Sequence, residues 1–209
     1  MRLAELSERS GVPTATIKYY LREGLLTPGR RVTATQSDYD EEHVRRLRLV
    51  RALVHVGRVP VATAREVLTA LEDETAPQSE RLGTAVCALP HGPDRQPEDT
   101  AARAARETAD EVVRRLEWHP APRSPAHGML VSALAALGRL GYPCGVDDVL
   151  PYGRVAEDIA AHELAVIDDI GAPTTQLEAA VALTVLYEPV LLALRRLAQG
   201  EEAARRFPG

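Results

Sequence analysis

Cysteine is scarce in this sequence, which holds only Cys87 and Cys144 in 209 residues. Two cysteines this far apart do not make a disulfide framework, so the small disulfide-stabilised secreted classes are excluded and a cytoplasmic location is expected. Neither cysteine has a partner at metal-ligand spacing. His119 and His127 flank a proline-rich turn, but surface or core histidines are commoner than ligands. We therefore expect no metal site and no cofactor.

Aromatic residues are also few, at 4% of the chain against 45% hydrophobic residues in all. The core must therefore be aliphatic, built from Ala, Leu and Val. Ala and Leu are good helix formers, and no long alternating run of the kind that marks a strand occurs. These features predict a mainly α fold.

Long uninterrupted apolar runs are missing as well. The richest stretch, Val181 to Leu194, is broken by Glu188 and Pro189. The first ten residues lack the apolar centre of a secretion signal. We therefore expect neither a membrane span nor a membrane partner.

The charge is acidic overall but unevenly distributed. The formal net charge is −5, which divides into +2 for residues 1–73 and −7 for residues 74–209. Lys18 is the only lysine among the 25 basic residues. Because nucleic-acid binding needs a basic surface, any such surface belongs in the first third of the chain.

Residues 1–73 carry regular helix signals. Gly11 supplies a turn, Pro13 stands at a helix entry, and Asp40 is a typical N-cap. A non-helical stretch from Leu25 to Tyr39 separates the second and third helices. The helices expected in this domain span residues 3–10, 14–23, 41–56 and 61–72.

The rest of the chain divides into a linker and a helical region. Prolines interrupt residues 74–97, which we expect to form a linker. Residues 98–209 are expected to form a helical domain for effector binding or dimerisation. Its helices are expected near residues 98–118, 125–141, 146–170 and 174–205.

The second expected helix has two faces. Ile17 and Leu21 share one face and are expected to dock on the first helix. The opposite face shows Ala15, Lys18, Tyr19 and Arg22. A small residue, two cations and a phenol suit close approach to the major groove of DNA, although an ordinary solvated helix face has the same composition.

The wider pattern resembles the MerR family of regulators, which have a winged helix-turn-helix. The resemblance covers about residues 1–72 and follows the order helix, tight turn, helix, polar loop with a distal tyrosine, and two further helices. The matching residues are Leu3-Ala4-Glu5-Leu6, Gly11-Val12, Thr16-Ile17-Lys18-Tyr19-Tyr20, Gly24-Leu25-Leu26, Pro28, Tyr39 and Arg45 to Leu47.

The resemblance implies a bacterial transcription regulator. Such proteins bind double-stranded DNA as homodimers at a pseudo-palindromic operator, and many bend the promoter so that RNA polymerase engages it. The second helix would enter the major groove, and the following loop would form the wing. The DNA contacts implied are Thr14, Thr16, Lys18, Tyr19 and Arg22 on the helix, Arg30, Arg31 and Tyr39 on the wing, and Arg45 at the start of the third helix.

The C-terminal region departs from the family, because no heptad run of three or more repeats follows the winged domain. The apolar helix at 174–205 is expected either to form the dimer or to fill the centre of a monomeric bundle. A small organic effector could bind between the helices, near the scarce aromatics Trp118, Tyr142, Tyr152 and Tyr187. Isolated aromatics of this kind are more often core residues.

Two other classes of function remain open. One is a protein interaction module in which the acidic helical half binds a partner protein and DNA binding is weak. The other is an enzyme, which we do not expect. The adjacent carboxylates Asp147-Asp148 and Asp168-Asp169 would point to different sides of a helix, so neither pair forms a catalytic dyad.

Overall fold

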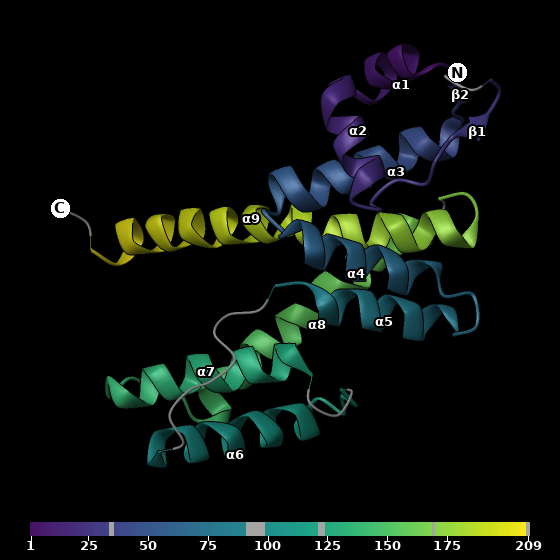
Figure 1. Ribbon diagram of the computed structural model, residues 1–209. Helices are drawn as coiled ribbons and strands as arrows, with labels where there is room; N and C mark the ends of the chain where they lie inside the picture. Colours follow the sequence, from purple (N-terminus) through teal and green to yellow (C-terminus); the bar gives the residue numbers. More distant parts are fainter. Residues whose placement is uncertain (34–35, 91–98, 121–123, 169, 208–209) are drawn as a thin grey trace. The chain divides into compact units, whose positions relative to one another are not determined.

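The computed structural model describes residues 1–33, 36–90, 99–120, 124–168 and 170–207. The chain forms two compact units (Figure 1). Met1–Leu89 and Ile170–Gly209 together form the first, which we call the composite unit. Pro90–Asp169 form the second, which lies between the two segments of the first in sequence and is called the inserted unit.

The composite unit contains a helix-turn-helix, a small wing and five further helical elements. Its elements in chain order are α1 (Leu3–Ser10), α2 (Thr14–Arg22), β1 (Arg30–Arg31), β2 (Ser37–Asp38), α3 (Glu41–Arg51), the π-helical turn η1 (Ala52–Val56), α4 (Val61–Glu72), α5 (Gln78–Ala88) and α9 (Pro173–Arg206). The two strands are antiparallel, with Arg30 opposite Asp38.

Local chemistry sets the helix boundaries. α1 ends at Gly11, whose φ of 65° is the left-handed conformation that glycine adopts most easily. α3 begins after Asp40, whose side chain accepts hydrogen bonds from the backbone amides of Glu42 and His43. The His43 Nδ1 atom lies 2.6 Å from Asp40 Oδ1, to which it donates a hydrogen bond. The hydrogen bond from His43 lowers the pKa of Asp40 below its ordinary value.

One core joins both segments of the composite unit. Leu6, Ile17 and Leu47 are fully buried in it. From α9, Leu177, Val181 and Val185 enter the same core. Burying each such aliphatic side chain contributes about 1.5–3 kcal/mol. The part of α9 from Leu177 to Val185 therefore belongs to the winged domain.

Gly57 permits the close approach of α9. A Cβ atom at this position would lie 2.1 Å from Val185 Cγ1 and 3.0 Å from the Leu53 carbonyl oxygen. The backbone of η1 can therefore contact the α9 side chains only because residue 57 has no side chain.

The inserted unit is a three-helix structure with a small core. Its helices are α6 (Thr100–Arg115), α7 (Pro125–Arg139) and α8 (Val146–Asp168), and α6 packs against both of the others. The buried core residues are Ala105, Ala109, Val131, Leu134 and Ala135. Most of these side chains are small, so the core holds little apolar volume.

The predicted mainly α fold is confirmed, but the units differ from the expected division. Within the expected linker, residues 78–88 form α5, which packs on α4 and α9. The expected C-terminal domain is divided, because α9 packs with Met1–Leu89. Residues 91–97 of the expected linker, and residue 98, lie outside the described residues.

Candidate nucleic-acid interface

The inner face of α2 is anchored in the core. Ile17 is 0% and Tyr20 is 2% exposed. The Tyr20 hydroxyl lies 3.0 Å from His55 Nε2, so its polar end is paired. Leu21, expected to be an inward residue, is only partly buried at the edge of this core. Tyr20, three residues after Ile17, takes the second inward position instead.

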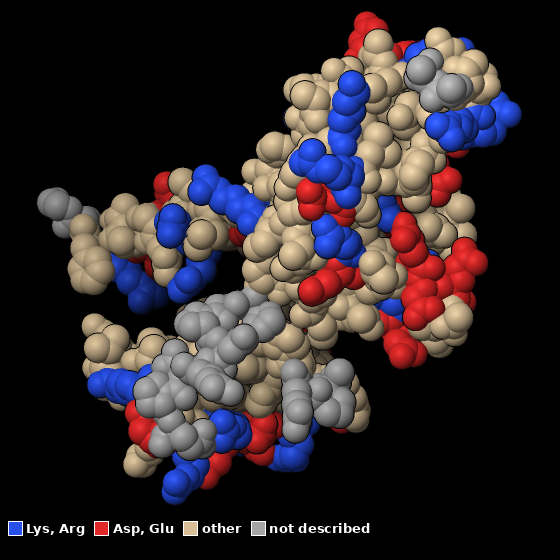
Figure 2. Space-filling view, viewed as in Figure 1, with Lys and Arg blue, Asp and Glu red and all other residues tan. Residues whose placement is uncertain are grey.

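The outer face of α2 is polar and cationic. Thr14, Lys18, Tyr19 and Arg22 are exposed, and Thr16 is half-buried. The Arg22 guanidinium lies 5.3 Å from the centre of the Tyr19 ring, a cation–π contact that orders both side chains. Figure 2 shows basic side chains over the side of the unit that carries α2 and the wing.

Acidic side chains gather elsewhere on the composite unit. Figure 2 shows them around the connection between α4 and α5. Glu72, Asp73 and Glu74 are exposed in this segment. The separation of charge leaves α2 and the wing as the face with the more positive potential, which is the one a phosphate backbone would approach.

The wing carries two exposed arginines, Arg30 and Arg31, on β1. Asp38 on β2 lies 3.6 Å from Arg30 and 3.8 Å from Arg2. The negative charge that the sequence places on the wing is therefore balanced by two guanidinium groups. Both arginine partners are at least half exposed in their side chains, at 84% and 52%.

Tyr39, predicted to contact DNA, lies at the base of the wing with little of its side chain exposed. It is 9% exposed, and its ring meets that of His43 edge-on with centroids 5.1 Å apart. Its backbone amide donates to the Met1 carbonyl, and the Met1 amino group donates to the Tyr39 carbonyl. Burial raises the pKa of its hydroxyl. Tyr39 therefore fixes the base of the wing to the start of the chain.

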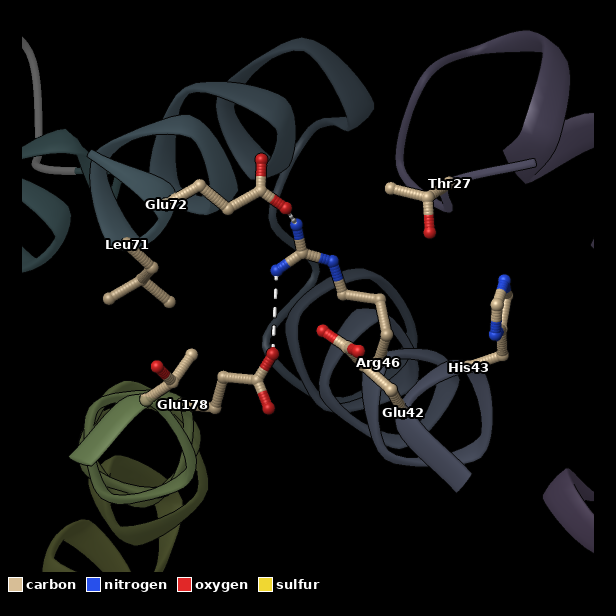
Figure 3. Close-up of a pocket in the computed structure, with 8 residues that line it drawn as sticks. Thr27, Glu42, His43, Arg46, Leu71, Glu72 and Glu178 are labelled. Carbon is tan, nitrogen blue, oxygen red and sulfur yellow. Dashed lines mark hydrogen bonds and ion pairs between the residues drawn. The ribbon is translucent and has the colours of Figure 1, made fainter. Parts of the chain in front are cut away.

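Arg45, also predicted to contact DNA, is paired with a carboxylate in the structure. Its Nε donates to Glu178 Oε2 on α9 at 3.0 Å. The next residue, Arg46, is buried and pairs with Glu178 and with Glu72. Figure 3 shows the Arg46 guanidinium between these two carboxylates, beside a cavity of about 50 Å³. Both guanidinium groups therefore serve contacts within the composite unit.

Two arginines join α3 to the helix-turn-helix. Arg51 Nη1 lies 3.3 Å from the Ser10 carbonyl and 3.4 Å from the Gly11 carbonyl, at the turn between α1 and α2. Arg9 on α1 forms a two-point contact with Glu41, with Nη2 and Oε2 2.8 Å apart. Sequence reasoning missed these roles and that of Glu178. The sequence signal that could have indicated the role of Glu178 is that it is a single glutamate within the apolar start of the last helix.

The predicted effector aromatics do not come together in one unit. Trp118, Tyr142 and Tyr152 belong to the inserted unit and are 39%, 62% and 66% exposed. Tyr187 is half-buried on α9 in the composite unit. The Trp118 indole donates to Glu157 at 2.8 Å. None of the four lines the cavity beside Arg46.

α9 is the one described helix with the length and hydropathy of a membrane span. The core helix of a soluble protein has the same properties, so this is weak evidence for a membrane. Leu177, Val181 and Val185 of this helix lie in the core of the composite unit. Pro189 lies within the same helix.

Among the described residues, no three His, Cys, Asp or Glu side chains come together to hold a metal ion. His127 instead lies 2.8 Å from Asp110 through Nε2.

An anchored α2 with a cationic outer face, followed by a two-stranded wing, defines a winged helix-turn-helix DNA-binding domain. Comparison with known proteins identifies the family. Residues 1–71 match the MerR HTH family of regulatory proteins. The N-terminal third of the chain is therefore a MerR-type HTH domain, and the described elements that follow it are all helices.

Two curated relatives share parts of the chain. The HTH-type transcriptional regulator AdhR of Bacillus subtilis (strain 168) is 32% identical over 57 residues, which are 27% of this chain and 41% of AdhR. The nodulation protein NolA of Bradyrhizobium elkanii is 30% identical over 118 residues, 56% of this chain and 54% of NolA. The chain thus spans about half the length or less of these relatives.

A solved structure resembles the whole chain. SCO5550, a candidate transcriptional regulator from Streptomyces coelicolor A3(2), is 48% identical, with a TM-score of 0.82. The similarity covers 99% of this chain and 98% of SCO5550. It therefore includes the C-terminal helices as well as the winged domain.

Proposed function

We propose that the protein binds a pseudo-palindromic promoter operator as a homodimer in the bacterial cytoplasm and controls transcription there together with RNA polymerase. The observation that carries this proposal is the orientation of α2. Ile17 and Tyr20 are buried, while Lys18, Tyr19 and Arg22 are exposed. The basic and phenolic groups thus stand on one accessible face, where they can reach phosphates and base edges.

The DNA contacts proposed are those of the predicted set whose side chains are accessible. Tyr39 and Arg45 are left out because their side chains serve internal contacts. The proposed set is Thr14, Thr16, Lys18, Tyr19 and Arg22 on α2, with Arg30 and Arg31 on the wing. Phosphate contacts from the wing would hold the flanking backbone while α2 occupies the major groove.

An apolar seam along α9, from residue 183 to residue 197, supports a dimer. Leu183, Tyr187, Val190, Leu194 and Leu197 follow a spacing of four and three residues, which is a two-heptad seam. Val190, Leu194 and Leu197 are 43%, 57% and 67% exposed. An exposed apolar seam of this kind fits a second copy of the same helix, whose seam it would bury.

The inserted unit supports the binding of a small organic effector. It exposes more large apolar side chains than it buries, among them Met129 at 49%, Leu140 at 72% and Tyr152 at 66%. An apolar ligand that covers this surface would complete its small core. Trp118 and Tyr142 would then contribute to an open surface instead of a closed pocket.

DNA binding by the purified full-length protein tests the proposal. The DNA is the region directly upstream of its own gene, with a shuffled fragment of equal length as control. We expect a protected pseudo-palindrome, and an affinity that falls steeply between 50 and 200 mM salt because phosphate contacts release counterions. Equal binding to both fragments would contradict the proposal and favour a protein interaction module.

A further inference from the structure

Glu178 on α9 lies in a buried charged cluster with two consecutive arginines of α3. Its Oε2 accepts from Arg45 Nε at 3.0 Å, and its Oε1 lies 3.5 Å from Arg46 Nη1. The side chains of Glu178 and Arg46 are only 9% and 10% exposed. Glu72 on α4 provides the second carboxylate for Arg46 (Figure 3). Three helices therefore meet at one guanidinium group.

A buried ion pair restricts movement more than an apolar contact does. Apolar side chains can slide past one another at little cost, but a buried charge that loses its partner is strongly destabilised. Desolvation already lowers the pKa of Arg46. α9 therefore cannot shift along α3 without separating Glu178 from Arg46. The cluster sets the register between the two helices.

α3 in turn holds the helix-turn-helix at two points. Near its start, Glu41 binds Arg9 of α1. At its end, Arg51 donates to the Ser10 and Gly11 carbonyls in the turn that precedes α2. The contacts with Glu178 lie between these two points. A displacement of α3 relative to α9 would therefore act on the turn that sets α2.

The position of Glu178 in the chain makes this contact suitable for transmission. The inserted unit ends at Asp169, and α9 begins at Pro173. Glu178 stands in the second turn of that helix. The polypeptide that returns from the inserted unit thus reaches the winged domain first through this part of α9.

We propose that Glu178 is a positioning residue for DNA recognition: through Arg45 and Arg46 it fixes α3, and through α3 the turn before α2, so that the C-terminal helix controls operator affinity. This inference rests on the proposed function, because it concerns the same DNA-binding face. Glu178 itself is a carboxylate on α9 and offers nothing that would bind phosphate.

The test compares operator binding by wild type and Glu178→Gln in the full chain, at several salt concentrations. The glutamine keeps the shape of the side chain but removes its charge. We expect the affinity per folded protein to fall about 2- to 30-fold, the range typical of residues that modulate the coupling of two sites. The slope of log affinity against log salt should stay at the wild-type value, because no phosphate contact is lost.

Amide hydrogen exchange separates positioning from general destabilisation. Positioning predicts faster exchange at residues 10–16 in Glu178→Gln, with α4 unchanged. A uniform rise over the whole composite unit would overturn the proposal, as would wild-type affinity in the variant. Glu202→Gln is the matched control, since Glu202 lies on the same helix and pairs only with Arg205 and Arg206 among the described contacts. If wild type itself fails to select the operator, the proposed function fails instead.

Discussion

At the scale of single residues, the orientation of α2 depends on positions where packing or charge pairing tolerates few other side chains. Ile17 and Tyr20 hold α2 from within, and Gly57 makes room for Val185. Arg46 needs both Glu72 and Glu178 because it is buried. Each of these residues acts through packing or pairing, and together they orient exposed residues such as Lys18.

The close approach at Gly57 gives a residue-scale prediction. Gly57→Ala would place a methyl group against Val185 Cγ1 and the Leu53 carbonyl. We expect a loss of about 1–3 kcal/mol in the free energy of unfolding, the usual cost of overpacking. Denaturant unfolding measures it. Val185→Ala combined with Gly57→Ala should recover part of the loss. Additive losses in the double variant would show that the two residues do not meet.

At the scale of elements, the sequence predicted most helices because their periodicity and caps are local. α1, α2 and α4 begin and end within one residue of the expected positions, since Gly11, Pro13 and Pro60 mark their ends. α5 was missed because prolines flank it and Gly83 lies within it. The membership of α9 in the winged domain could not be predicted, because it depends on contacts between residues more than 100 positions apart.

The candidate site was predictable to a similar degree. Helical spacing alone placed Lys18, Tyr19 and Arg22 on one face. It could not distinguish Tyr39 and Arg45, which are polar enough for a surface but pair internally. Their partners, Met1 and Glu178, are distant in sequence.

The ion triad on α6 gives a prediction of pH dependence. Hydrogen bonds from Arg114 and Arg115 lower the pKa of Glu111 from 4.5 to about 2. A lowered folded-state pKa means that the triad stabilises the fold fully above about pH 4.5 and loses this effect as the pH falls towards 2. Glu111→Gln should therefore unfold at a lower temperature than wild type at pH 7.

The two proteins should converge as the pH falls to 2 and below, because Glu111 becomes protonated in wild type as well over this range. Thermal unfolding followed by circular dichroism at pH 2, 3, 4.5 and 7 gives the comparison. Glu107→Gln, an exposed change on the same helix, serves as the control. A difference between wild type and Glu111→Gln that stays constant down to pH 2 would contradict the assignment.

The seam on α9 gives a second prediction at this scale. Leu194→Glu should convert the dimer to a monomer, because it places a charge at the centre of the proposed interface. Sedimentation equilibrium measures the molar mass. Leu192→Glu is the matched control, since Leu192 is 45% exposed on the same helix but lies off the seam. If Leu194→Glu and Leu192→Glu were both monomers, or if neither were, the seam would be rejected as the dimer contact.

At the scale of the whole molecule, the chain is a winged domain completed by its own C-terminal helix, with a second unit inserted in the sequence. The acidic charge of residues 74–209 does not oppose DNA binding, because the proposed interface lies within residues 14–31.

This organisation predicts the outcome of a deletion. If residues 90–169 are replaced by a long flexible Gly/Ser linker, the composite unit should still fold and bind the operator, since its core is intact. Truncation after Leu89 should instead yield an unstable domain, because Leu177, Val181 and Val185 are lost from the core. Limited proteolysis and circular dichroism distinguish the two. A fully stable 1–89 fragment would show that α9 is dispensable for the fold.

The most direct measurement for the whole account is operator binding by the double variant Lys18→Ala, Tyr19→Ala. Both side chains are exposed, so the variant should fold like wild type. We predict at least a tenfold (~1.4 kcal/mol) loss of affinity and a salt slope lowered by about 1, as expected when a lysine–phosphate contact is removed. Arg154→Ala, an exposed change in the inserted unit, should bind like wild type. A folded double variant with wild-type affinity and salt slope would show that α2 does not contact the DNA.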